Sequence, residues 1–215
     1  VKAVSESSAD VGDRTNDTLR INGEELGCKI VGEGGNLGLT QLGRIEFALN
    51  GGRINTDAMD NSAGVDCSDH EVNIKIALEA ALKKGKITIE KRNKVLESMT
   101  DEVADLVLND NFLQSQAVSN AVNHGTSHTG VFASFISRLT KTGFLNRKIE
   151  FLPSSKDIKK RQSENIGFTR PEFCVMLSYA KMEIYQELLT SDLVDDKYFE
   201  EELISYFPTA MKKDF

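Results

Sequence analysis

The amino-acid sequence predicts a mostly α-helical protein with a small α/β unit at its N-terminal end. Up to about residue 66 the segments are short, mixed and glycine-rich, and apolar runs end in loops that carry asparagine. Beyond that point, long stretches repeat apolar residues at helical spacing. We therefore expect a partial Rossmann-type unit of short parallel strands within residues 1–66 and a helical C-terminal domain over residues 67–215.

Short elements and two glycine-rich loops are expected in the N-terminal part. The elements are a helix over Val11–Ile21, a turn at Asn22-Gly23, a strand over Lys29–Val31, a helix over Gln41–Leu49 and an extended piece over Arg53–Met59. The loops are Gly32–Gly38 and Asp60–Val65. Loops that follow parallel strands meet beyond the same edge of the sheet. We therefore expect Asn36 and Asn61 to face one small-molecule crevice, since an amide side chain both donates and accepts hydrogen bonds.

Long helices are expected in the rest of the chain. Ser68 and Glu71 have the spacing of a capping box, which predicts a helix start there and a buried face of Val72, Ile76 and Ala80. Thr169-Arg170-Pro171-Glu172 predicts a second capped start. Further helices are expected over Thr88–Asn109, Val131–Leu139 and Lys197–Tyr206, the last of them ending at Pro208.

Composition excludes several classes of function. The chain has 26 basic and 33 acidic residues, a formal charge of −7, which argues against nucleic acid and anionic membranes as partners. No apolar run is long enough to span a bilayer. Cys28, Cys67 and Cys174 lie far apart, which argues against a disulfide framework and favours the cytoplasm. His124 and His128 are expected to be surface residues, and no metal site is expected.

The two loops also carry a resemblance to a known family. Val31–Asn36 resembles the E-G-A-N loop of glutamate dehydrogenases, and Asn61–Val65, followed by Ser68 and Glu71, resembles their N-A-G-G-V-x-x-S-x-x-E segment. The stretches Gly32–Ala48, Gly51–Ile76, Phe151–Pro153, Thr169–Glu172 and Tyr179–Lys181 resemble the C-terminal part of the very long bacterial NAD-dependent glutamate dehydrogenases. The likeness runs from about Asp10 to the end, and the chain, which begins with Val1, is expected to be a piece of a longer protein.

The resemblance implies NAD as cofactor and L-glutamate and 2-oxoglutarate as substrate and product. It places Asn36 and Asn61 against the nicotinamide and its ribose, and Ser68 against the side-chain carboxylate of glutamate. Close approach of the backbone to the ligand would be permitted by the glycines Gly34, Gly35 and Gly64. The chain departs from the family pattern in two places, since Gly35 stands where Ala is usual and Ser62-Ala63 stands for Ala-Gly.

The resemblance also implies that parts of the enzyme lie outside this chain. The Lys and Asp that carry the proton transfers in this family are expected upstream, so no catalytic residue is assigned here. No G-x-G-x-x-G turn for a pyrophosphate occurs in the sequence. We therefore expect the chain alone neither to oxidise glutamate nor to bind NAD tightly, and we expect it to act with the rest of the parent polypeptide in a homo-oligomer.

Three alternatives stay open from the sequence. Ser68 is also explained as a simple helix cap, and Asn36 and Asn61 as ordinary turn residues, with Glu33 and Asp60 satisfying loop amides. A related amino-acid dehydrogenase for branched or aromatic substrates would share the second loop. The helices after residue 66 also suit a non-catalytic docking or oligomerisation module. His70, in the first turn of the expected helix, is interpreted as structural or solvent-facing.

Overall fold

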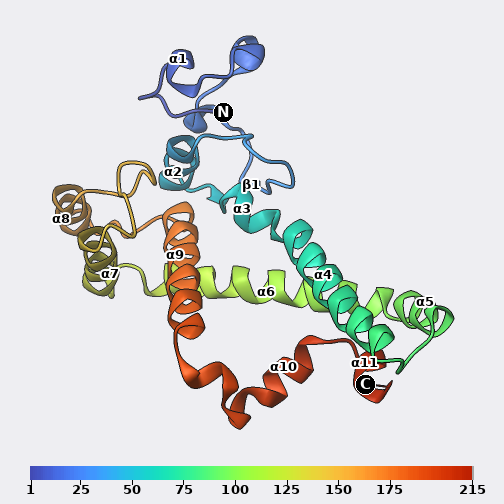
Figure 1. The fold of residues 1–215 in the computed structure, drawn as a ribbon. Helices are drawn as coiled ribbons and strands as arrows, with labels where there is room; N and C mark the ends of the chain where they lie inside the picture. The colour runs from blue at the N-terminus through green and yellow to red at the C-terminus, as the bar shows by residue number, and fades with distance from the viewer. Residues whose placement is uncertain (215) are drawn as a thin grey trace. The chain divides into compact units, whose positions relative to one another are not determined.

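The computed structural model describes residues 1–214, which form two compact units that interleave along the chain. The first unit combines Val1–Asn61 with Gln114–Met182, and the second combines Ser62–Leu113 with the residues from Glu183 onward. Two long helices, α6 (Thr100–His124) and α9 (Arg170–Leu189), contribute residues to both units. The described chain is mostly α-helical, as the sequence predicts, and its strands form one two-stranded sheet (Figure 1).

A small β-α-β unit lies in the N-terminal part of the first unit. Strands β1 (Ile30–Val31) and β2 (Arg53–Ile54) pair in parallel, with Ile30 opposite Arg53. Helix α2 (Gln41–Leu49) connects them and lies beside them in Figure 1. After α2, a side chain at Gly52 would collide with the Phe47 ring, so the chain turns closely back into β2. The expected helix over 41–49 is confirmed, and the strand expected over 29–31 is present over Ile30–Val31.

The expected helix over Val11–Ile21 is wrong. A helix starts earlier, as α1 (Ser8–Val11), because Ser7 and Asp10 cap each other. It stops at Gly12, whose left-handed φ of 76° closes the helix end. The chain then forms two 3-10 turns, η1 (Arg14–Leu19) and η2 (Gly23–Glu25).

The helical part of the first unit packs around the start of α9. Helix α7 (Thr129–Lys141) confirms the expected helix near 131–139, and it lies beside α8 (Ser155–Ser163) in Figure 1. The capped start at Thr169 is also confirmed, since the buried Glu172 carboxylate accepts hydrogen bonds from the Thr169 N–H and hydroxyl and from Arg161. The core beneath contains Val118, Ile136, Leu139, Leu145, Phe168, Phe173, Cys174 and Met176.

The second unit contains α4 (Ser62–Lys83), α5 (Ile89–Ser98), the first part of α6, η3 (Asp192–Asp195), η4 (Lys197–Phe199), α10 (Glu200–Tyr206) and α11 (Thr209–Asp214). Its core is formed by Ile74, Leu78, Val95, Met99 and Met211. The expected helix over 197–206 is present as η4 followed by α10. The helix expected over 88–109 is instead broken at Met99, a buried residue between α5 and α6. None of the described helices is long and apolar enough to cross a bilayer.

Helix α4 differs most from the sequence-based expectation. It begins at Ser62 rather than near Ser68, so Ser68 is not a cap. The expected loop over 60–65 is wrong as well, since Asp60 ends α3 (Asp57–Asp60), residues 62–65 form the first turn of α4, and Asn61 alone lies between the two helices. The expected buried face is wrong too, since Val72 and Ile76 are exposed by 51% and 63%. The residues that α4 buries are His70, Ile74, Leu78 and Ala81. This row starts two positions earlier than the expected one, a rotation of about 200° around the helix axis.

Candidate functional site

The two predicted asparagines lie in contact. Asn61 Nδ2 donates a hydrogen bond to Asn36 Oδ1 over 3.0 Å. Asn36 lies in the loop after β1, and Asn61 caps the C-terminal end of α3, the helix that follows β2. Both amides therefore lie beyond the carboxyl ends of two neighbouring parallel strands, as the sequence analysis expects. Asn36 is exposed and Asn61 half-buried, which leaves their remaining donors and acceptors accessible to a ligand.

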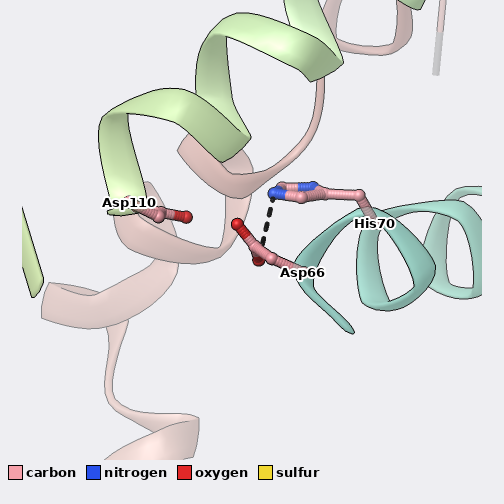
Figure 2. A group of neighbouring side chains, drawn as sticks. All are labelled: Asp66, His70 and Asp110. Atoms are coloured by element: carbon pink, nitrogen blue, oxygen red, sulfur yellow. Dashed lines mark ion pairs between the residues drawn. The ribbon is translucent and has the colours of Figure 1, made fainter. Parts of the chain in front are cut away.

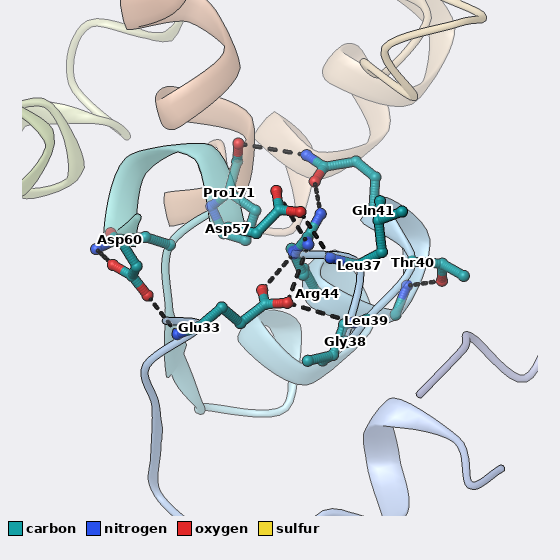
Figure 3. Close-up of polar contacts among 12 residues, drawn as sticks. Glu33, Leu37, Gly38, Leu39, Thr40, Gln41, Arg44, Asp57, Asp60 and Pro171 are labelled. Atoms are coloured by element: carbon teal, nitrogen blue, oxygen red, sulfur yellow. Dashed lines mark hydrogen bonds and ion pairs between the residues drawn. The ribbon is translucent and has the colours of Figure 1, made fainter. Parts of the chain in front are cut away.

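A buried ion network joins α2 to the loop that follows β1 (Figure 3). Arg44 on α2 donates from Nε to Glu33 Oε2 over 2.6 Å and from Nη2 to Glu33 Oε1 over 3.0 Å. The same Nη2 lies 3.2 Å from Asp57 Oδ1. Burial alone would lower the pKa of Arg44, but its hydrogen bonds to Glu33 and the charge of Asp57 outweigh that effect and raise the pKa. The arginine therefore stays charged and joins α2, the first loop and α3.

The same carboxylates bind the loop backbone. The Leu37 N–H donates to Asp57 Oδ2 over 3.0 Å, and the Leu39 N–H donates to Glu33 Oε1 over 3.3 Å. The Glu33 N–H in turn donates to Asp60 Oδ2 over 2.9 Å, so Glu33 and Asp60 satisfy loop amides, as the sequence analysis considered. Leu37 has a left-handed φ of 65°, which is unfavourable for leucine and is held by the Asp57 contact. Such strained residues are common at ligand-binding loops.

A second polar cluster holds the end of β2. Arg170, the first residue of α9, donates from Nε to Asn55 Oδ1 over 2.5 Å. Asn55 Nδ2 donates to Asp60 Oδ1 over 2.6 Å. The other guanidinium nitrogens of Arg170 reach Ser119 Oγ at 2.9 Å and Ser115 Oγ at 3.0 Å on α6. The turn between β2 and α3, which leads to Asn61, is thus braced by helices from distant parts of the chain.

A pocket of about 840 Å³ lies along the strands of the same unit. Residues that line it include Ile30, Ile54, Asn55, Asp60, Ser115 and Arg170. Neither Asn36 nor Asn61 lines this pocket. The pocket and the asparagine pair are therefore neighbouring features that share the turn at Asn55 and Asp60, and the asparagine pair is the better match to the sequence pattern.

The predicted glycines differ in their setting. A side chain added at Gly34 or Gly35 would meet no atom within 4 Å among the described residues, apart from its neighbours in sequence. The fold itself therefore does not require glycine at these positions, and the space above the loop is open. In the second unit, Gly64 and Ser68 lie on the first two turns of α4. Both are exposed, and they are four residues apart, so they share one face of that helix.

Sequence reasoning missed the residues that position the asparagines. Arg44 is flanked by Gly43 and Ile45 in a short helix, and a charge between such residues is a signal for a buried partner. Asp57 and Arg170 carry no comparable signal, because their partners lie 20 and 115 positions away in the sequence.

Comparison with known proteins supports the resemblance noted in the sequence. The family model described as bacterial NAD-glutamate dehydrogenase, catalytic domain, matches residues 1–121, and the model described as glutamate dehydrogenase, C-terminal, matches residues 165–215. The chain is 48% identical over its full length to an NAD-specific glutamate dehydrogenase of Mycobacterium tuberculosis and 46% identical to those of Halomonas elongata and Pseudomonas aeruginosa. It spans 13% of the length of each of these relatives.

Proposed function

The chain belongs to the bacterial NAD-glutamate dehydrogenase family, and on that premise we propose that it forms part of the wall around nicotinamide and substrate in such an enzyme. The reaction is the oxidative deamination of L-glutamate to 2-oxoglutarate and ammonia, for which NAD supplies the hydride acceptor. The observation that carries the proposal is the hydrogen bond between Asn36 and Asn61 beyond the ends of two parallel strands. A crevice at such strand ends is where α/β folds bind dinucleotides.

The residue roles follow from what each position offers. Asn36 and Asn61 would orient the nicotinamide ribose and amide through the hydrogen-bonding atoms that their mutual contact leaves over. Gly34 and Gly35 would let the loop backbone approach the ligand, which agrees with the open space above them. For the second unit, the family resemblance supports a role of Gly64 in close approach of the backbone to the cofactor, and of the exposed Ser68 hydroxyl as a donor to the side-chain carboxylate of glutamate.

The β-α-β unit is proposed to be the C-terminal portion of a larger Rossmann-type sheet. Two strands of two residues each are too short to form a stable sheet by themselves. Ile30 in β1 is 68% exposed although it is apolar, which favours further covering of the strands by other parts of a longer polypeptide. We accordingly propose that residues 1–66 and 67–215 belong to two domains of the parent enzyme, the first binding the cofactor.

The same logic predicts that the chain alone is inactive. The sequence offers no G-x-G-x-x-G turn for the pyrophosphate of NAD.

We also propose that the parent enzyme is a cytoplasmic homo-oligomer. The three cysteines are free, as in a reducing compartment, and the exposed apolar residues Ile184, Tyr185 and Leu189 at the end of α9 suit contacts with further protein.

Replacement of Asn61 by Asp in the longer dehydrogenase polypeptide tests the asparagine pair. The substitution keeps the size of the side chain, removes the amide donor and places a negative charge beside the nicotinamide ribose. We expect KM for NAD to rise at least about tenfold, the effect of losing one charged or polar ligand contact, while the thermal unfolding midpoint changes little. Asn93→Asp, which introduces the same charge on an exposed position of α5, is the matched control.

Equal KM values for Asn61→Asp and Asn93→Asp would refute the role of the asparagine pair. NADH production by the separately expressed 215-residue chain would refute the incompleteness of the site.

The alternative with an apolar amino acid as substrate is less well supported. An apolar substrate pocket would favour a small hydrophobic residue at position 68, whereas the serine is exposed on α4 and offers a hydroxyl. Turnover of leucine or phenylalanine faster than glutamate by the longer enzyme would favour this alternative. A purely structural role for the helices is compatible with either enzyme.

A further inference from the structure

A buried histidine in the second unit has no hydrogen-bond partner among the residues that the structure describes. His70 on α4 is 2% exposed, and neither of its ring nitrogens forms a hydrogen bond within the described residues. Its ring stacks on Tyr206 with 4.5 Å between ring centroids and 14° between the planes, which fixes the orientation of the imidazole. A buried polar group without a partner is costly, and such groups in native proteins usually mark a bound water, an ion or a functional role.

Two carboxylates lie around this histidine. Asp66 is one turn earlier on the same helix, with Oδ1 3.9 Å from His70 Nε2. Asp110 comes from α6, and Figure 2 shows its carboxylate facing Asp66 and the His70 ring. One ligand atom from each of the three residues lies within 4.8 Å of the other two. Both aspartates are half-buried, so the three side chains form a cluster partly shielded from solvent.

We propose that Asp66, His70 and Asp110 bind a divalent transition-metal ion, with Zn²⁺ as the best fit. A dication would neutralise two carboxylates and give the buried imidazole nitrogen a partner. Imidazole favours Zn²⁺ and its neighbours in the first transition row over Mg²⁺ and Ca²⁺, which prefer oxygen ligands alone. Aspartate and histidine are both common zinc ligands. Because Zn²⁺ is usually four-coordinate, three protein ligands leave the fourth position for water.

Binding of Zn²⁺ by these three residues would require only side-chain movement. Tetrahedral Zn²⁺ with bonds of about 2.0–2.1 Å places its ligand atoms about 3.3 Å apart. The present separations of up to 4.8 Å therefore need to close by at most about 1.5 Å, within reach of aspartate rotamer changes. Asp66 and His70 are four residues apart on one helix, a spacing that places both side chains on the same face.

Metal binding would cross-link α4 to α6 within the second unit. The two helices are already joined nearby by a hydrogen bond of 2.5 Å from Ser62 Oγ to Asn111 Oδ1. A metal at Asp66, His70 and Asp110 would fix the next turn of α4 in the same way. The site does not depend on the proposed dehydrogenase function. The expected helix start at Ser68 separates Asp66 from the helix that contains His70, so the sequence pattern alone does not indicate this cluster.

Metal content of the full chain, produced without a polyhistidine tag, tests the site. The protein is saturated with Zn²⁺, freed of excess by gel filtration, and its zinc is measured by mass spectrometry. We expect the wild type to retain one equivalent more than His70→Gln. His124→Gln is the matched control, because it removes an exposed histidine on α6 outside the cluster and should retain as much zinc as the wild type. Equal zinc in the wild type and His70→Gln overturns the proposal.

A second variant and a second probe cover the case in which His70→Gln fails to fold. Asp110→Asn alters a half-buried residue without changing its size, and we expect it to weaken Zn²⁺ binding at least about tenfold, as loss of a contact at a metal site does. Co²⁺ bound to the wild type should give the visible absorption of a four-coordinate ion, and Asp110→Asn should lose it. Unchanged affinity and an unchanged Co²⁺ spectrum in Asp110→Asn would contradict the site.

Discussion

Replacement of Arg44 by methionine should destabilise the first unit by leaving the Glu33 carboxylate buried without its cation. The side chains of Arg44 and Glu33 are 6% and 4% exposed, and two hydrogen bonds of 2.6 and 3.0 Å join them. Methionine fills much of the volume of the arginine stem, so the main effect is electrostatic. Asp57 loses the same cation, but it keeps its hydrogen bonds from the Leu37 and Ala58 amides.

The expected loss is about 3–5 kcal/mol, the usual cost of removing one partner of a buried ion pair. The double variant Glu33→Gln with Arg44→Met should recover at least about 2 kcal/mol of it, because glutamine carries no charge. Its amide oxygen still accepts a hydrogen bond from the Leu39 N–H, as Glu33 Oε1 does. Comparing the single and double variants therefore separates the cost of the unpaired Glu33 charge from the cost of the packing lost at Arg44.

Urea unfolding and hydrogen exchange together measure the effect. With a slope of about 2 kcal/mol per molar urea, the loss corresponds to a midpoint shift of about 1.5–2.5 M. Because the chain has two compact units, hydrogen exchange at the Leu37 and Leu39 amides reports on the first unit by itself. Both amides donate to the carboxylates that Arg44 contacts, and we expect their protection to fall.

Two results would refute this reasoning. One is a midpoint shift below about 0.5 M for Arg44→Met with unchanged protection of both amides. The other is a double variant no more stable than Arg44→Met, which would show that the charge on Glu33 is not what makes the single substitution costly.

Three further predictions concern the loop glycines, acid stability and the cysteines. Gly34→Ala should leave the unfolding midpoint unchanged, since no described residue beyond its neighbours in sequence comes within 4 Å, yet it should raise KM for NAD at least about tenfold in the longer enzyme. Gly35→Ala should keep KM for NAD within about twofold, because Ala is usual at that position in the family. Equal KM values for the two variants would contradict this. Burial raises the pKa of Asp57, but the Leu37 amide and the Arg44 guanidinium outweigh burial and hold the pKa below its ordinary 3.8. The stabilisation from the charged Asp57 is therefore present above pH 3.8 and is lost as the pH falls through the lowered pKa. Asp57→Asn should remove this acid dependence, which an acid titration of the unfolding midpoint measures, and an identical titration in the wild type and the variant would count against it. Burial raises the pKa of Cys174 to about 11, so a thiol reagent at pH 8 should modify the exposed Cys28 and Cys67 and reach Cys174 only in denaturant. Rapid modification of all three thiols in the native chain would contradict the burial of Cys174.

The sequence by itself determined the features that depend on neighbouring residues. The helix over 41–49, the strand at 30–31 and the start of α9 follow from local apolar spacing, glycine turns and a capping pattern. The segments around Asn36 and Asn61 likewise carried the family resemblance, because each is a short motif of adjacent residues. Local signals also misled, since the Ser68 and Glu71 pattern occurs inside α4 and not at its start.

Tertiary structure alone decided which groups meet. The contact of Asn36 with Asn61 joins residues 25 positions apart, and Arg170 reaches Asn55 across 115 positions. The face that α4 buries, and with it the cluster around His70, depends on what packs against the helix, because rotation of an amphipathic helix by two residues is not fixed by its own sequence. Local backbone preferences determine which helices and strands form, whereas burial and charge neutralisation between distant segments determine which of them pack together. Burial and charge neutralisation of this kind act only once the chain has folded.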